Sequence, residues 1–291
     1  MEARTLASVT IALVLWASAF AGIKAGLTGF GPGELALLRF GTASLVLLAY
    51  GFLTRMRMPR RADVGRLLAA GLFGITAYHL CLNFGETNVS ASAASLIIAS
   101  GPVFTAILAH MKLGERLTWW GWLGIAIAFS GVAVLTLGGS GGGLAFEPAA
   151  ILVLAAAMST AIYFVISKPL LDRYGALEFT SYCIWFGTLP MLVFLPGLVA
   201  QLPSASSSAI SSALYLGVFP GAIAYVLYSH TLSKLPASIA SSFLYVQPVT
   251  ATVIAWLWIH EVPTLPTLVG GALALVGVGL TTARGRQRIT T

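Results

Sequence analysis

The chain has 291 residues, of which 58% are hydrophobic and 9% are charged, and its mean hydropathy is +0.91. Soluble domains have about a quarter of their residues charged, so this composition excludes a water-soluble globular protein. The formal net charge is +7 at pH 7, but the basic residues lie in short segments between apolar stretches. That distribution excludes nucleic acid as the expected partner and favours the lipid bilayer.

Ten apolar stretches follow one another along the chain, each close to the roughly 20 residues that a membrane-spanning helix needs. They occupy residues 7–29, 35–53, 67–84, 91–111, 119–137, 149–167, 179–199, 210–228, 237–259 and 267–283. Strands of a membrane barrel need only about 9–11 residues. The sequence therefore predicts an all-α integral membrane protein with ten transmembrane helices.

The charged residues between these stretches predict the orientation. If the N-terminus is cytoplasmic, 14 of the 16 basic residues fall in cytoplasmic segments. The opposite loops contain Glu34, Glu86, Glu147 and Glu261 and no basic residue. This positive-inside pattern predicts cytoplasmic N- and C-termini in a protein of the inner membrane.

The chain contains an internal repeat. Residues 91–134 align without gaps to residues 237–280, 146 positions later, and 14 of the 44 positions are identical. A proline stands thirteen residues before a glutamate in each copy: Pro102 before Glu115, and Pro248 before Glu261. Each half contains five spans, an odd number, so the second half is expected to insert upside down, as in secondary transporters. The expected division is a first repeat at 1–138, a glycine-rich outer linker at 139–148, and a second repeat at 149–291 with a basic cytoplasmic tail.

The repeated segment resembles a known family. The stretch "SAAS…GPVFTAILAHMKLGERLTWWGWLGIAIAFSGVAVL" and its second copy are similar to the paired EamA domains of the drug/metabolite transporter superfamily. The resemblance extends from "LWASAFAGIK" in the first span to "GGALALVGVGL" in the last, and the P-x12-E-x8-G-x6-G spacing occurs twice. Ten-helix members include bacterial amino-acid exporters, among them YddG-type exporters of aromatic and neutral amino acids. The resemblance implies that spans one to four and six to nine enclose the pathway, while spans five and ten buttress it.

Polar and aromatic residues at mid-membrane depth are candidates to line that pathway, because lipid does not solvate polar groups. The candidate substrate-binding residues are Trp16, Tyr78, His79, Asn83, Ser95, Tyr163, Tyr225, Ser229, Ser241 and Tyr245. Helix packing, an interfacial aromatic belt or a hydrogen bond to the backbone is the alternative role of each. Histidine is the side chain whose ordinary pKa lies near neutral pH, so His79 is the candidate for proton coupling, with a plain hydrogen-bonding role as the alternative. An aromatic, largely uncharged cavity suits neutral or zwitterionic solutes, so amino-acid export is the first hypothesis, with other small metabolites or drugs as the alternative.

Proline is expected to kink the fourth and ninth spans, because it removes a backbone hydrogen bond. Pro102 and Pro248 are therefore candidate hinges, with static kinks as the alternative. Arg39 is expected to extend to the membrane surface or pair with Glu34, and the alternative is that it holds a substrate carboxylate at the outer mouth.

Glu115 and Glu261 are expected to be structural, each beside the start of the following span. Thr118 and Thr264 are the candidate N-caps there. Glycines of spans five and ten predict close packing between these spans, or a homodimer through the same faces.

Several chemistries have no motif in this sequence. There is no GxxxxGK[ST] phosphate-binding loop and no nucleophile–base pair, so neither ATP hydrolysis nor other enzyme activity is expected. No cofactor or metal is expected either. An integral membrane enzyme and a passive channel are the alternatives from other functional classes. The expected partners are a small-molecule substrate and lipid, and the expected state is a monomer or weak homodimer.

Overall fold

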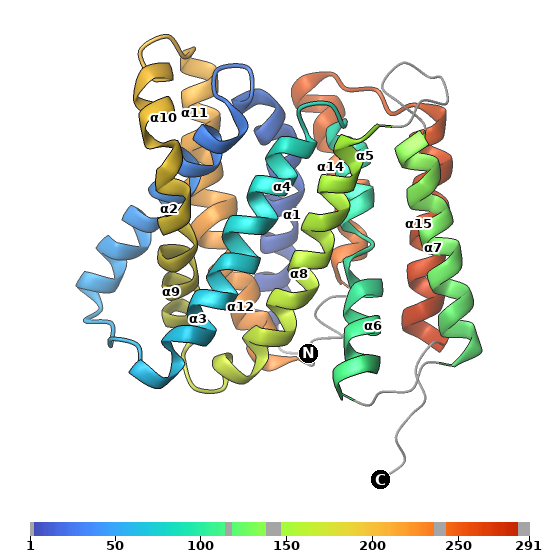
Figure 1. The fold of residues 1–291 in the computed structure, drawn as a ribbon, viewed down its shortest axis with the longest axis horizontal. Coiled ribbons are helices and arrows are strands. Elements are labelled where there is room, and N and C mark those ends of the chain that lie inside the picture. Colours follow the sequence, from blue (N-terminus) through green and yellow to red (C-terminus); the bar gives the residue numbers. More distant parts are fainter. Residues whose placement is uncertain (1–2, 114–117, 138–146, 236–242, 285–291) are drawn as a thin grey trace.

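The computed structural model describes residues 3–113, 118–137, 147–235 and 243–284, and every regular element in these ranges is helical (Figure 1). Six helical stretches are long and apolar enough to cross a membrane: Ala3–Gly26, Pro32–Leu53, Arg61–Gly85, Ala149–Leu171, Ala176–Gln201 and Ser207–Lys234. Four shorter apolar helices are Ala91–Thr105, Trp119–Val134, Gln247–Ile259 and Leu265–Leu280. These results support the predicted all-α integral membrane fold.

The first part of the chain begins at the lower end of the bundle in Figure 1. Its elements are α1 (Ala3–Gly26), α2 (Pro32–Leu53), η1 (Arg61–Asp63), α3 (Val64–Gly71), η2 (Leu72–Ala77), α4 (Tyr78–Gly85), α5 (Ala91–Ile98), α6 (Gly101–Leu113) and α7 (Trp119–Leu137).

The second part of the chain begins at the upper end, so α8 runs in the opposite direction to α1 (Figure 1). Its elements are α8 (Ala149–Leu171), α9 (Ala176–Thr188), η3 (Leu189–Phe194), α10 (Leu195–Gln201), α11 (Ser207–Leu216), η4 (Gly217–Ile223), α12 (Ala224–Lys234), η5 (Phe243–Val246), α14 (Gln247–Ile259) and α15 (Leu265–Arg284).

Two helical stretches are interrupted by a π-helical turn at matching positions. η2 separates α3 from α4, and η4 separates α11 from α12. Adding 146 to the numbers of η2 gives residues 218–223, which lie inside η4. A π-turn shifts the helical register and leaves backbone carbonyls free for other donors, and such turns often occur at functional sites.

The fourth and ninth spans are not continuous helices bent at proline. A two-residue turn at Ala99 and Ser100 separates α5 from α6, and Pro102 is the second residue of α6. Pro248 is likewise the second residue of α14, directly after the 3₁₀ turn η5. The prediction of kinks inside continuous helices is therefore wrong: each proline lies in the first turn of a new helix. A proline in the first helical turn has no intrahelical hydrogen bond to remove, so it starts a new helix at no such cost.

α7 and α15 pack along each other as a pair at one side of the bundle (Figure 1). Gly131 of α7 lies against the backbone of Gly270 and Ala274, and Gly277 of α15 lies against Gly124 and Ala128. A methyl group at either Gly131 or Gly277 would overlap the facing backbone. The predicted packing of spans five and ten within one chain is confirmed, and it depends on small residues, as is common in membranes.

Candidate functional site

A buried cavity of about 50 Å³ lies between helices from both parts of the chain. Five of the ten candidate substrate-binding residues line it: Trp16, Tyr78, His79, Tyr163 and Tyr225. The other lining residues are Ala19, Phe20, Arg39, Gly74, Leu82, Ile98, Thr160, Phe164, Leu244 and Gln247. None belongs to α7 or α15, in agreement with the expected buttressing role of those two helices.

His79 and Tyr225 meet across the two halves. The His79 Nε2 atom lies 2.9 Å from the Tyr225 hydroxyl, and the two residues are 146 positions apart, the repeat distance. The Tyr225 hydroxyl donates its hydrogen to the carbonyl oxygen of Gly74 at 3.2 Å. It must then accept from His79, so Nε2 carries the ring hydrogen of the neutral imidazole. The other ring nitrogen, Nδ1, is buried and has no hydrogen-bond partner in the described structure.

The two π-turns supply backbone acceptors to side chains near the cavity. The carbonyl of Phe73 accepts from the Ser159 hydroxyl at 2.8 Å. The carbonyl of Pro220 accepts from the Trp16 indole N–H at 3.1 Å. Gly74 and Pro220, 146 residues apart, thus each bind an aromatic donor, because the wide turn has released their carbonyls.

Seven of the fifteen residues that line the cavity carry an aromatic ring. The Trp16 ring lies 5.1 Å from the ring of Tyr225 and 4.7 Å from that of Tyr228, measured between centroids. The Tyr163 ring packs directly over Gly74, where a methyl group would overlap it. The absence of a side chain at Gly74 therefore lets Tyr163 reach the cavity wall.

The remaining candidates do not line the cavity or lie outside the described residues. Asn83 is buried and donates to the carbonyl of Pro32 at 3.0 Å, and Ser229 shares a hydrogen bond with Thr180. Ser95 donates to the carbonyl of Ser92 in its own helix. Asn83, Ser229 and Ser95 therefore have the alternative role given above, in which a polar side chain forms hydrogen bonds within the protein and does not line the pathway. Ser241 and the side chain of Tyr245 lie outside the part of the chain that the structure describes.

Two residues that line the cavity, Arg39 and Gln247, are not among the ten predicted substrate-binding residues, although carboxylate binding at the outer mouth was the alternative role for Arg39. Arg39 was expected at the membrane surface or beside Glu34, but it is 1% exposed and forms no ion pair with Glu34, both being described residues. Its charge inside an apolar helix was the available signal, because an ionisable residue within a membrane span usually faces the protein interior. Gln247 precedes Pro248 and gives no comparable signal in the sequence.

A carboxylate joins the two halves at the upper end of the bundle. The backbone N–H groups of Ala91 and Ser92 donate to Glu261 at 3.0 and 2.9 Å, and the Ser92 hydroxyl donates at 2.7 Å. Glu261 therefore caps α5. The sequence had predicted that it would instead lie at the start of the following span, α15. Thr264 does cap α15, by accepting from the N–H of Thr267 at 3.4 Å.

Thr118 caps α7 in the same way, because it accepts from the N–H of Gly121 at 3.3 Å. Glu115 lies outside the described residues.

A second carboxylate, Glu86, lies directly after α4 and is fully buried. Neither of its oxygen atoms has a hydrogen-bond partner among the described residues. Burial raises the pKa of Glu86 well above its usual range. The positive charge of Lys24 partly offsets this rise, the carboxylate of Glu261 increases it, and the positive charge of Arg39 lowers it again. Glu86 is therefore held closer to its neutral form than an exposed glutamate.

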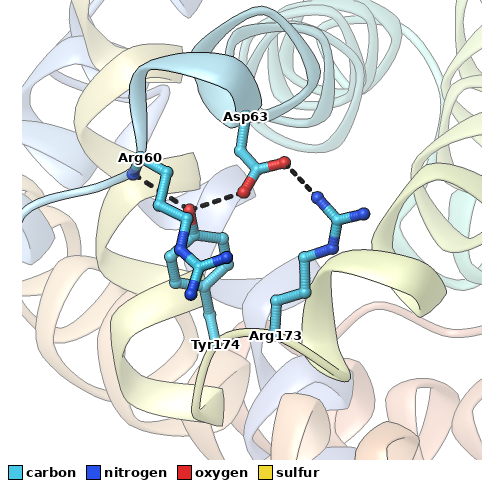
Figure 2. A network of polar contacts seen from close by, with 4 residues as sticks. All are labelled: Arg60, Asp63, Arg173 and Tyr174. Carbon is cyan, nitrogen blue, oxygen red and sulfur yellow. Dashed lines mark hydrogen bonds and ion pairs between the residues drawn. The ribbon is translucent and has the colours of Figure 1, made fainter.

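A polar network joins the lower ends of the two halves (Figure 2). Asp63 accepts from Arg173 at 2.6 Å and from the Tyr174 hydroxyl at 2.9 Å. The backbone N–H of Arg60 donates to the same hydroxyl at 3.1 Å. Asp63 is 2% exposed while Arg173 is half exposed, so the segment before α3 is fastened to the connection between α8 and α9.

The chain is similar to known transporters over nearly its whole length. The sequence profile of the EamA-like transporter family matches residues 4–137 and again residues 147–283. A Bacillus subtilis protein described as "Uncharacterized transporter YdfC" is 42% identical over 275 residues, covering 94% of this chain and 89% of that protein. A Streptantibioticus cattleyicolor protein described as "Probable terminal-alkyne amino-acid exporter" is 40% identical over 283 residues, covering 97% and 95%.

More distant relatives agree. The "Uncharacterized inner membrane transporter YedA" of Escherichia coli is 27% identical over 247 residues, covering 83% of this chain and 78% of that protein. A crystal structure superposes with a TM-score of 0.68 at 20% identity, covering 100% of this chain and 99% of that one, which shows a shared fold. With the family profile matching twice and relatives at 42% and 40% identity, this chain belongs to the EamA-like transporter family and is a multi-pass transporter of the inner membrane, not an enzyme.

Proposed function

We propose that the protein exports small neutral or zwitterionic metabolites, above all amino acids, by alternating access. The observation that carries this proposal is the buried aromatic cavity around the His79–Tyr225 pair, which both halves of the chain build. The name of the Streptantibioticus cattleyicolor relative supports the amino-acid class. Export of other small metabolites or drugs is the second candidate, since aromatic walls also bind such solutes.

The proposed topology has ten spans in two inverted five-helix repeats, 1–138 and 149–291, linked by residues 139–148. The opposite directions of α1 and α8 support it (Figure 1). The basic residues between apolar stretches support placing the lower end, and with it both termini, in the cytoplasm. In this arrangement Glu261 lies on the outer side and the Asp63 network on the inner side.

The size of the cavity implies movement during transport. A ligand pocket usually encloses about 300 Å³ or more, several times the space present here. The cavity must therefore widen when a solute enters, while one end of the bundle opens and the other stays joined. The breaks next to Pro102 and Pro248 face the cavity region through Ile98 and Gln247, and we assign the two prolines to the moving joints.

Counterflow in proteoliposomes tests the function. Vesicles loaded with one unlabelled amino acid at a time receive external labelled amino acid, with and without a pH gradient. Saturable accumulation supports an amino-acid carrier, whereas a passive channel gives no counterflow. Accumulation that depends on the pH gradient indicates proton-coupled transport, for which His79 is the candidate group. If none of the amino acids drives counterflow in folded protein, the amino-acid assignment is wrong and the panel moves to other neutral solutes.

A further inference from the structure

Arg39 is a buried charge without a partner on the wall of the cavity. It lies on α2 about 10 Å along the helix from its first residue, at 1.5 Å per residue. Its Nε and Nη1 atoms are buried and have no hydrogen-bond partner in the described structure. The guanidinium carbon lies 5.0 Å from the centroid of the Phe40 ring. A buried guanidinium with unused donors is costly unless an anion pairs with it.

The repeat does not require a charge at this place. The position 146 residues after Arg39 is Trp185, an uncharged residue whose indole N–H donates to the carbonyl of Ser44 at 3.2 Å. Arg39 therefore has no structural counterpart in the other half, and its charge belongs to one side of the cavity only. This asymmetry is expected of a group that recognises one end of a solute.

The carboxyl group of Glu86 does not account for Arg39. Glu86 acts on Arg39 electrostatically, but no ion pair joins the two described side chains and both Glu86 oxygens are unpaired. Glu86 also does not line the cavity, whereas Arg39 does. The uncharged polar groups that share the cavity wall with Arg39 belong to Trp16, Tyr78, His79, Thr160, Tyr163, Tyr225 and Gln247.

We propose that Arg39 binds the carboxylate group of the transported solute. The planar guanidinium presents two parallel N–H donors that match the two oxygens of a carboxylate. The existing space of about 50 Å³ is enough for one or two water-sized groups at ~30 Å³ each, the scale of a carboxylate, while the rest of the solute requires the widened cavity. The inference deepens the proposed function, since it names the part of an amino acid that the site reads.

The test compares acids with their own amides. The probes are leucine against leucinamide, and 4-methylpentanoate against 4-methylpentanamide. Binding to the purified full chain is measured as the ligand-dependent rise in unfolding temperature, which does not need transport. The wild-type protein is expected to prefer each acid by roughly tenfold to a hundredfold, the range of one charge-assisted contact. In Arg39→Gln the preference should fall to about one, and in Arg39→Lys, which keeps the charge without the planar fork, to an intermediate value.

Two further variants distinguish carboxylate binding by Arg39 from the alternative that Arg39 only offsets the buried carboxyl group of Glu86. Arg66→Gln removes an exposed arginine of α3 and should leave the preference unchanged. The double variant Arg39→Gln/Glu86→Gln removes the guanidinium and the buried Glu86 carboxyl group together. If Arg39 served only to offset Glu86, this variant would recover the preference for acids. We expect no recovery.

The outcomes distinguish this inference from the proposed function. Binding of 4-methylpentanoate but not leucine, lost in Arg39→Gln, would leave Arg39 as a carboxylate site and refute the amino-acid assignment. Binding of leucine and leucinamide alike by the wild type, or an unchanged preference in Arg39→Gln, would overturn the role of Arg39 while amino-acid transport stands. Should Arg39→Gln not fold, an unchanged preference in Arg39→Lys would overturn the role equally.

Discussion

Removal of one hydroxyl group tests the contact between the two halves of the chain. In Tyr225→Phe the aromatic ring stays, but two hydrogen bonds disappear: the one from His79 Nε2 at 2.9 Å and the one to the carbonyl of Gly74 at 3.2 Å. His79 Nδ1 already has no partner, so the whole imidazole would be buried without a hydrogen bond. The Gly74 carbonyl, released by the π-turn, would lose the hydrogen bond that it accepts from Tyr225.

The magnitude follows from these two groups. Leaving a buried donor or acceptor without its partner costs about 1–3 kcal/mol, so the two together are expected to cost about 2–6 kcal/mol. At roughly 2 °C per kcal/mol for a chain of this size, the unfolding temperature in detergent should fall by about 4–12 °C. The assay is thermal unfolding of purified protein, followed by tryptophan fluorescence.

Tyr228→Phe is the matched control. Tyr228 lies one turn further along α12 and is equally buried, but its hydroxyl has no hydrogen-bond partner in the described structure. Its removal should leave the unfolding temperature unchanged or raise it slightly, since an unpaired buried polar group is lost. Equal effects of the two substitutions would refute the assigned hydrogen bonds.

Two more predictions concern the cavity wall and the upper contact. Gly74→Ala should displace the Tyr163 ring and slow counterflow, whereas Gly65→Ala in the same span meets no atom within 4 Å and should leave it unchanged; equal rates would argue against the packing described. Glu261→Gln weakens the contact with Ser92 by about 0.5–2 kcal/mol, as for the loss of a helix cap, and should speed labelling of a cysteine placed in α5 by an impermeant maleimide added outside. An unchanged labelling rate would contradict a closing role for this carboxylate.

Composition and spacing alone predicted much of this fold. Apolar stretches of about twenty residues have few alternatives in a membrane, because every backbone polar group must be satisfied within the segment. The glycines at 131 and 277 also predicted the α7–α15 pair, since small residues at matching positions allow helices to approach closely. Both inferences depend only on properties that can be read from one sequence: the length of the apolar stretches and the spacing of the small residues.

Five of the ten residues that the sequence predicted line the cavity, which has fifteen lining residues, and the failures share one cause. Trp16 and Tyr225 line the cavity because an aromatic residue with a polar tip, deep in a span, usually finds a polar partner inside the protein. Asn83 and Ser229 have the same general character, but the hydrogen bonds that they make lead to neighbouring helices and not into the cavity. The Oδ1 atom of Asn83 has no partner in the described structure. Which neighbour faces a side chain depends on tertiary packing, and helical periodicity does not encode it.

The π-turns and the Glu261 contact were missed for the same reason. The carbonyls that η2 and η4 release are stabilised by donors more than eighty residues away in the sequence, such as Ser159 for Phe73. Glu261 binds Ser92, 169 residues earlier, rather than the adjacent helix start. Sequence spacing indicated that a carboxylate would meet a helix N-terminus but gave no information on which helix.

The most direct test of the central claim is whether a small group attached inside the cavity stops transport. Thr160 lines the cavity, and Thr160→Cys in a variant with Cys81 and Cys183 replaced by alanine gives one reactive thiol there. Methyl methanethiosulfonate adds a methylthio group, and mass spectrometry measures the modified fraction. The account predicts that complete modification abolishes amino-acid counterflow and that bound leucine slows the modification. Full modification with unchanged counterflow would contradict it, because the solute would then be crossing the membrane by another path.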